Sequence, residues 1–207
     1  MADRHDTVGR GFRATFKDAG TFGFWRNIVV YFCVFSVVGH LVEWPYCWIG
    51  ATFFGSVPPD AEVLTNPLKP FFVYGFGITA CAVLLVPYKE HLRKYLPRPW
   101  MALLVFYVIS VFIGMGMELT QGFLQNQPVD GVYPLWDVHD HPGNILGQAW
   151  IVNDIFLGAI ITVVVWVVYP ACERAIAKLS ERQANINALV IVGITAVITV
   201  ITYFFWG

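Results

Sequence analysis

Five long apolar segments alternate with short polar ones along the chain. They run approximately over residues 27–49, 71–86, 101–124, 149–168 and 189–206. A helix needs about 20 apolar residues to cross the hydrocarbon core of a bilayer. The second segment is short and lies between Pro70 and Pro87, so it either extends into its flanks or spans a thinned region. The pattern predicts an all-α integral membrane protein with about five transmembrane helices in one bundle.

The composition agrees with this pattern. Of the 207 residues, 57% are hydrophobic and only 13% are charged, which is far more apolar than an ordinary soluble domain. The net charge is −1, and no basic surface suited to nucleic acid is indicated. We therefore expect the lipid bilayer as the main partner and no nucleic-acid partner.

The basic residues predict an orientation. Twelve of the thirteen Lys and Arg residues precede the first segment or follow the second or the fourth, and only Lys69 follows the first. Positively charged loops remain cytoplasmic, so we expect a cytoplasmic N-terminus and a C-terminus outside. Residues 1–26 would be a cytoplasmic basic segment, in which Phe12 and Phe16 indicate an interfacial amphipathic helix or a basic tail. Residues 27–175 would form a four-helix membrane core, and residues 176–207 an additional C-terminal helix.

Familiar catalytic motifs are absent from the sequence. The four cysteines form no CxxC pair and look like packing residues. There is no GxxxxGK[ST] phosphate loop, no HExxH and no GxSxG, so an ATP-driven role would require a separate ATPase. Enzymatic activity is therefore not indicated.

Three carboxylates, Glu43, Glu118 and Asp154, lie inside the predicted helices. Carboxylates at membrane depth are costly and usually face a bundle interior or a wet cavity. Residues three and four apart share a helix face. Polar and small residues recur at that spacing: Ser36, His40, Glu43 and Cys47; Ser110, Gly114, Glu118, Gln121 and Gln125; and Asn144, Gly147, Ile151, Asp154, Gly158 and Thr162. These stripes predict an outward-facing polar cavity, or else interhelical hydrogen bonds that only lock the bundle.

The candidate substrate-binding residues are His40, Glu43, Glu118, Gln121, Asn144, Gln148 and Asp154. We expect the three carboxylates to form one coupled site. Like charges held close in a poorly solvated cavity cannot all remain ionised cheaply unless a cation binds.

The stretch "YPLWDVHDHPGNILGQ", residues 133–148, joins the third and fourth segments. Pro142 and Gly143 break the backbone there. Three interpretations stay open: a solvated turn, a lid, or a divalent metal site. The lid would use Trp136 for packing and Asp137 and Asn144 as caps. The metal ligands would be Asp137, His139, Asp140 and His141, whose carboxylates and imidazoles are competent for zinc or a similar ion. No other cofactor is indicated.

Several motifs occur in an order typical of one bacterial membrane family. They are "FSVVGHLVEW" (35–44), "PFFVYGFG" (70–77), the glutamate of "GMELTQG", the pair Trp136 and Asp137, and "GNILGQ" (143–148). On these motifs the chain resembles the ABC-transporter type IV permease-like proteins over residues 31–175. The matching positions are Gly39, Glu43, Tyr74, Gly75, Phe76, Gly77, Glu118, Trp136, Asp137, Asn144 and Gly147. Of these, Tyr74, Gly75, Gly77, Trp136, Asp137 and Gly147 are candidate structural or lid residues.

The chain also departs from the family pattern. The family often reads Asn-x-Asn-Gly-Arg where this chain has Asn144 followed by Ile, Leu, Gly and Gln, and Asp154 replaces a usual serine. These departures change the polar lining at these positions and, with it, the expected ligand.

The resemblance implies a permease-like transport component in the cytoplasmic (inner) membrane of a bacterium, with an unknown substrate. A separate ATPase would dock on the basic cytoplasmic loops 88–99 and 173–182, and a homo-oligomer is compatible with this interpretation. Two alternatives remain: a membrane-embedded metal-binding protein or enzyme that uses the Asp/His loop, and a structural or interaction protein.

Overall fold

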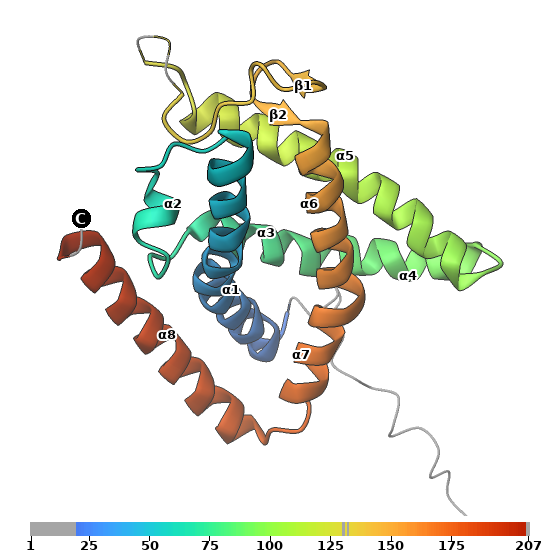
Figure 1. The fold of residues 1–207 in the computed structure, drawn as a ribbon. Helices are drawn as coiled ribbons and strands as arrows, with labels where there is room; N and C mark the ends of the chain where they lie inside the picture. The colour runs from blue at the N-terminus through green and yellow to red at the C-terminus, as the bar shows by residue number, and fades with distance from the viewer. Residues whose placement is uncertain (1–19, 130, 132, 206–207) are drawn as a thin grey trace, which may run out of the picture.

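The structure is a computed structural model that describes residues 20–129, 131 and 133–205. The amphipathic segment predicted around Phe12 and Phe16 lies outside the described residues. In the described part, five helical spans are long and apolar enough to cross a membrane: Phe22–Phe54, Phe72–Tyr95, Pro99–Gln125, Ile151–Ile176 and Glu181–Phe204. The predicted all-α fold with five membrane-length helices is therefore confirmed (Figure 1).

Three spans are composites of α-helix and π-helical turns. The first joins α1 (Phe22–Ile49) to η2 (Gly50–Phe54), the second joins α3 (Phe72–Ala80), η3 (Cys81–Leu85) and α4 (Val86–Tyr95), and the fourth joins α6 (Ile151–Val163), η4 (Val164–Val168) and α7 (Tyr169–Ile176). The other two spans are the single helices α5 (Pro99–Gln125) and α8 (Glu181–Phe204). A short helix α2 (Glu62–Thr65) and a hairpin of β1 (Asn144–Ile145) and β2 (Ala149–Trp150) lie in the loops.

Two of the π-helical turns precede a proline inside a span. Segment η3 leads into Pro87 and η4 leads into Pro170, each in the first turn of the next helix. Proline donates no backbone hydrogen bond, and its ring clashes with the carbonyl four residues earlier. A π turn rearranges these bonds, so the helix continues past the proline. The second span therefore does extend beyond Pro87, as one of the two sequence interpretations proposed.

The basic stretches 88–99 and 173–182 contain more helix than the sequence suggested. Interpreting them wholly as loops was wrong, because α4 continues to Tyr95 and α7 to Ile176. The predicted stripe on the fourth segment is also corrected. Asn144 and Gly147 lie in the β-hairpin, and α6 begins at Ile151. Gly147 and Leu146 have positive φ angles of 69° and 56°, which fit a tight turn and not a helix.

Glycines allow close helix contacts in two pairs of helices. A Cβ atom on Gly75 of α3 would lie 2.7 Å from the Phe32 carbonyl oxygen of α1, and one on Gly158 of α6 would lie 2.8 Å from the Val111 backbone nitrogen of α5. Small residues at such positions let helix backbones approach within a membrane. The molecule thus contains an α1–α3 pair and an α5–α6 pair, and α8 packs mainly along α1.

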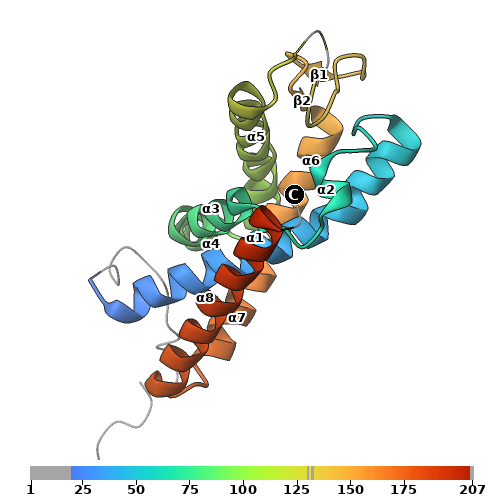
Figure 2. The same cartoon turned by 90° about the vertical axis from the view of Figure 1, so that its left-hand side faces the viewer.

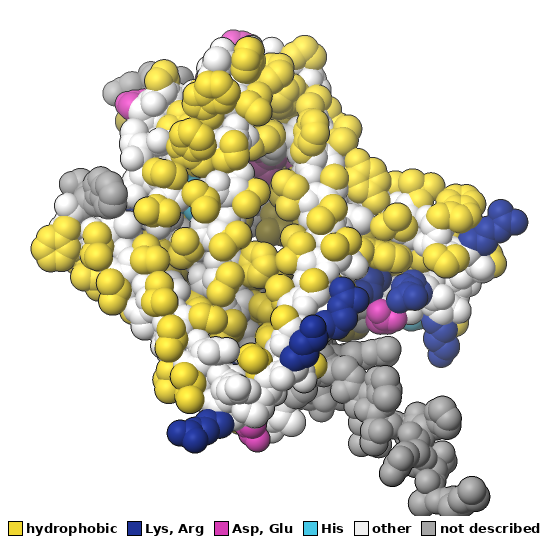
Figure 3. Space-filling model, turned by 60° about the horizontal axis from the view of Figure 1, so that its bottom comes forward, with side chains coloured by type: hydrophobic (Ala, Val, Ile, Leu, Met, Phe, Trp, Pro, Cys, Tyr) yellow, Lys and Arg dark blue, Asp and Glu magenta, His cyan; other side chains and the backbone are white. Residues whose placement is uncertain are grey.

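The two ends of the molecule differ in character. The β-hairpin lies at one end and the turn between α7 and α8 at the opposite end in both views (Figures 1 and 2). Apolar side chains cover most of the face in Figure 3, whereas Lys and Arg side chains gather along its edge. Such a surface suits lipid contact along the middle of the helices. The direction in which the helices cross the membrane remains a prediction.

Candidate functional site

Polar side chains from three helices meet near the hairpin end of the bundle. Helix α1 provides Glu43 and Tyr46, α5 provides Glu118, and α6 provides Asn153 and Asp154. We call these five residues the carboxylate cluster. The Tyr46 side chain interacts electrostatically with the carboxyl groups of Glu43, Glu118 and Asp154. The phenol of Tyr46 thus lies within electrostatic range of all three candidate carboxylates.

A hydrogen-bonded chain connects the helices within this cluster. The Tyr46 hydroxyl donates to Oδ1 of Asn153 at 2.5 Å, and Nδ2 of Asn153 donates to Oε1 of Glu118 at 2.5 Å. The amide is suited to this role, because it accepts through its oxygen and donates through its nitrogen. Asn153 consequently links α1 to α5 through α6.

Asp154 is the least satisfied member of the cluster. Its side chain is 0% exposed, and neither carboxylate oxygen has a hydrogen-bond donor among the described residues. The carboxyl group of Glu118 is within hydrogen-bonding reach. Two ionised carboxylates are both acceptors, so they cannot bond to each other without a proton or a cation between them.

Glu43 lies three residues before Tyr46 on α1. Its side chain interacts with the Tyr74 hydroxyl of α3 and with the Cys47 thiol of its own helix, whereas its buried Oε2 atom has no hydrogen-bond partner in the described part of the chain. Tyr74, matched through the family resemblance, thus contacts a candidate carboxylate directly. Its ring also lies against Gly39, where a side chain would clash.

The cluster contains acids without a counter-charge. Within the described residues the ion pairs are Lys69–Glu62, Lys89–Glu90 and Arg93–Glu90, and none includes Glu43, Glu118 or Asp154. Burying an ionised carboxylate without a partner costs several kcal/mol, on the order of 3 or more. Such a cluster can offset that cost by binding a proton or a cationic ligand.

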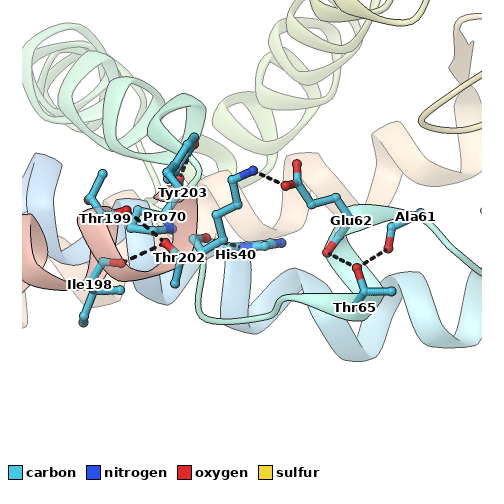
Figure 4. Close-up of polar contacts among 10 residues, drawn as sticks. His40, Ala61, Glu62, Thr65, Pro70, Ile198, Thr199, Thr202 and Tyr203 are labelled. Carbon is cyan, nitrogen blue, oxygen red and sulfur yellow. Dashed lines mark hydrogen bonds and ion pairs between the residues drawn. The ribbon is translucent and has the colours of Figure 1, made fainter. Parts of the chain in front are cut away.

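His40, a candidate member of the site, is held elsewhere. The ring stacks on Phe71 with centroids 3.9 Å apart, and Nδ1 is hydrogen-bonded to the Lys69 carbonyl oxygen. The Lys69 ammonium pairs with Glu62 and lies 4.2 Å from the ring centre of Tyr203 on α8 (Figure 4). His40 therefore joins α1 to the following loop. The charge of Lys69, the single basic residue of that loop, is paired with Glu62.

Gln148, another candidate, belongs to a network that fastens the loop to the end of α5. Its Nε2 donates to the Asn126 carbonyl oxygen at 3.1 Å, and its own carbonyl oxygen accepts from Trp136 Nε1 at 3.0 Å. Asn126 is 0% exposed and donates from Nδ2 to the Trp136 carbonyl oxygen at 2.7 Å. Gln148 and Trp136 thus fix the loop. Gln121 lies half-buried on α5, one turn after Glu118.

Asn144 shapes the hairpin itself. Its Nδ2 donates to the carbonyl oxygens of His139 and His141, at 2.7 and 3.1 Å, and its Oδ1 accepts from Gly147 N at 3.2 Å. Position 147 favours glycine, because a Cβ atom there would lie 2.9 Å from Nδ1 of His139. These contacts are those of a folded turn, and they do not bring Asn144 to the carboxylates.

The Asp/His loop offers little support for the metal hypothesis. Asp137 Oδ1 accepts from the His139 backbone at 3.0 Å, and the His141 ring packs against Trp150 at 4.8 Å. Asp140 is exposed. In the described part of the chain, no three His, Cys, Asp or Glu side chains are grouped so that they could hold a metal ion.

Sequence reasoning overlooked Tyr46 and Asn153. The signal for Tyr46 was available, because it lies three residues after Glu43 and so shares its helix face. No spacing rule could select Asn153, since adjacent residues on a helix point in different directions. Asn153 reaches the site because its amide bridges helices, which only the assembled bundle reveals.

A separate apolar groove of about 400 Å³ lies between the beginnings of α1 and α8. Phe22, Trp25 and Leu189 are among its lining residues, and Arg26 and Asn185 are its polar members. Arg26 donates to Asn185 Oδ1 at 2.8 Å. None of the carboxylate cluster lines this groove.

Comparison with known proteins identifies the family. The model of the family described as "Putative ABC-transporter type IV" matches residues 30–203, which includes most of α8 as well as the quoted motifs. Neither curated proteins nor solved structures give a significant match. The family match and the five membrane-length helices together support a multi-pass membrane component of a transport system. The chain belongs to the "Putative ABC-transporter type IV" family.

Proposed function

We propose that the protein is the membrane-embedded component of a transporter and that its carboxylate cluster binds a cationic or polar solute. The observation that carries this proposal is the convergence of Glu43, Glu118 and Asp154 around Tyr46, without a basic partner in the described residues. A cluster that only locked the helices together would be expected to pair its oxygens with donors. Asp154 has no such donor.

The expected orientation puts this site near the outer face and the basic stretches 88–99 and 173–182 on the cytoplasmic side. A separate ATPase is the proposed source of energy, because the sequence contains no phosphate loop of its own. The stretches 88–99 and 173–182 are its proposed docking surface, since they contain seven basic residues. The proposed membrane is the inner membrane of a bacterium.

Ligand-dependent stability tests the site. The purified protein would be unfolded thermally in the presence of inorganic cations, polyamines and neutral polar solutes. A ligand at ten times its dissociation constant should stabilise the protein by about 1.4 kcal/mol. Glu118→Gln should abolish that response, because it removes a charge and keeps the acceptor for Asn153.

Asp60→Asn is the matched control, because Asp60 is an exposed acid in the loop after η2. It should leave the response unchanged. Glu118→Gln and Asp154→Asn should also be coupled, so that the double variant loses less than the sum of the single losses. Additive effects of these two changes would contradict a shared site. A scaffold role would be indicated if every variant changed basal stability and no ligand had an effect.

A further inference from the structure

A second buried carboxylate lies at the far end of the same helical span. Asp154 and Glu173 both belong to the span Ile151–Ile176, and their separation of 19 residues corresponds to about 28 Å along the helix. This distance is close to the thickness of the hydrocarbon core, about 30 Å. The span therefore carries one buried acid near each end.

Glu173 is enclosed by polar groups of α1 and α7. Its side chain is 8% exposed, and its Oε1 accepts a hydrogen bond from the Tyr31 hydroxyl. The Tyr169 hydroxyl is also close to the carboxyl group, and the rings of Tyr31 and Tyr169 lie 5.5 Å apart. Oε2 of Glu173 nevertheless has no hydrogen-bond partner of normal geometry among residues 20–129, 131 and 133–205.

Asn27 provides a second, independent sign of an incomplete site. It lies one helical turn before Tyr31 on the same face of α1, and it is 2% exposed. Its Oδ1 accepts from Arg26 Nε at 3.2 Å, whereas its buried Nδ2 has no hydrogen-bond partner in the part of the chain that the structure describes. A buried amide donor normally has a protein or water partner. We call Asn27, Tyr31, Tyr169 and Glu173 the Glu173 cluster.

The nearest basic groups are engaged with other atoms. Arg26 bonds to Asn27 and Asn185, and Lys89 donates to the Val165 carbonyl oxygen at 3.3 Å and lies 3.4 Å from Glu90. Neither forms an ion pair with Glu173 among the described residues. The remaining titratable neighbour is Cys172. Among the described residues, Glu173 thus has phenols around it and no ion-pair partner.

We propose that the Glu173 cluster is a second binding site, which takes up one positive charge as a proton or an alkali cation. A proton would bind a carboxylate oxygen of Glu173 and give the neutral acid. An alkali cation would bind that oxygen together with the phenol oxygens of Tyr31 and Tyr169. In either form the bound charge offsets the cost of burying the carboxylate.

This inference deepens the proposed function and rests on it only for the role of the site in transport. Between the two clusters lie apolar side chains of the main core, including Ile78, Phe106, Ile161 and Val165. A charge cannot cross such a layer cheaply. The two clusters would therefore be loaded in different conformations of the bundle, one from each end.

Thermal unfolding of the purified protein, followed by tryptophan fluorescence, tests the second site. The melting temperature would be measured in NaCl, KCl and choline chloride at equal ionic strength, and across a range of pH. Choline is too large for a buried site and serves as the salt control. We expect either NaCl or KCl, or a fall in pH, to raise the melting temperature by about 3 °C. Glu173→Gln should abolish that rise.

Two matched variants separate this site from its neighbours. Glu90→Gln removes a half-exposed acid on the adjacent α4 and should keep the response. Asp154→Asn should also keep it, even if the carboxylate cluster fails to bind any solute. Tyr31→Phe retains the acid and removes both a phenol oxygen and a hydrogen bond to the ionised carboxylate. It should weaken a cation response about tenfold in concentration, or move a proton response by about one unit to higher pH. Tyr31→Phe therefore gives a second test if Glu173→Gln does not fold.

The outcomes decide the proposal. A response that requires Glu173 and distinguishes NaCl from KCl would identify an alkali cation, and a Glu173-dependent response to pH alone would identify a proton. The proposal would be overturned if the wild type responded to neither. It would also fail if Glu173→Gln responded like the wild type. If the wild type bound no solute at the carboxylate cluster but kept the Glu173-dependent response, the proposed function would be refuted and the Glu173 cluster would still be supported as a site.

Discussion

At the scale of single residues, the main feature is a set of acids whose neighbours cannot neutralise them. Asp154 illustrates this most clearly, because the closest ionisable group is another carboxyl, that of Glu118. A carboxylate in an ion pair has its own charge balanced within the protein, as Glu62 has with Lys69. The contrast between these acids within one chain favours ligand binding over a purely structural role for Asp154.

Tyr46 provides a test at this scale. Tyr46→Phe removes the hydroxyl that donates to Asn153 and leaves an amide oxygen without its donor, so we expect a loss of about 1 kcal/mol in the free energy of unfolding. We also expect weaker stabilisation by any solute bound at the carboxylate cluster. Both effects can be measured by thermal unfolding with and without that solute.

Tyr107→Phe is the control for Tyr46→Phe. The Tyr107 hydroxyl also joins two helices, since it donates to the Ile155 carbonyl oxygen at 3.3 Å, but it does not belong to the carboxylate cluster. Its removal should cost a similar or smaller free energy and leave the solute response intact. Equal solute responses in the two variants would argue against a role for Tyr46 in the site.

Individual contacts were harder to predict from the sequence than individual residues. The acids Glu43, Glu118 and Asp154 were identified because charge at membrane depth is unusual in any sequence. The expected role of His40 depended on its position in the same stripe, yet the ring stacks on Phe71. A helix face spans a wide arc, so spacing alone cannot tell which neighbour a side chain meets.

At the scale of the elements, glycine positions determine how closely the helices pair. Gly158 of α6 and Gly116 of α5 differ in this respect although both occur within long apolar helices. A Cβ atom on Gly158 would meet the backbone of Val111 at 2.8 to 2.9 Å, whereas one on Gly116 would meet nothing within 4 Å. Sequence alone shows the two glycines as equivalent.

Alanine substitutions at these glycines should therefore have opposite effects. Gly158→Ala should destabilise the protein by about 1–3 kcal/mol, because backbone atoms of α5 cannot move aside as a flexible side chain could. Gly116→Ala should be neutral or stabilising by up to about 1 kcal/mol, since alanine favours the helix. The midpoints of thermal unfolding compare the two variants. Similar losses in both would show that the α5–α6 contact is not as close as the structure has it.

The existence of the helices was predictable, and their ends were not. Runs of about 20 apolar residues are a strong signal, but the predicted segments ended at residues 86 and 168, shortly before Pro87 and Pro170. Both prolines are instead accommodated by π-helical turns. Whether such a turn forms depends on which backbone donors the carbonyl oxygens of the previous turn can reach. Because α7 was not foreseen, Glu173 was counted with a loop and the Glu173 cluster was missed.

At the scale of the whole molecule, α1 and the span of α6, η4 and α7 run antiparallel. Tyr46, late in α1, bonds to Asn153 near the start of α6, and Tyr31, early in α1, bonds to Glu173 near the end of α7. The two elements are thus joined by polar contacts at both ends. A transporter must open such contacts one end at a time, which is the arrangement required for access from alternate sides of a membrane.

The orientation of this assembly gives the last prediction. Twelve of thirteen basic residues lie in segments on one side of an alternating topology, and the exception, Lys69, is neutralised by Glu62. Because positively charged segments resist translocation, Asp60 should face outward and Lys94 the cytoplasm. Both positions are exposed.

Single cysteines at these two positions, in a background without the four native cysteines, would be treated with a membrane-impermeant maleimide. In intact cells stripped of any outer membrane barrier, Asp60→Cys should be labelled at once and Lys94→Cys only after the cells are permeabilised. Labelling of both variants after permeabilisation controls for local accessibility. The reverse pattern would turn the carboxylate cluster toward the cytoplasm and the Glu173 cluster outward. An ATPase could then no longer dock on α4 and α7, and the proposed direction of solute access would be inverted.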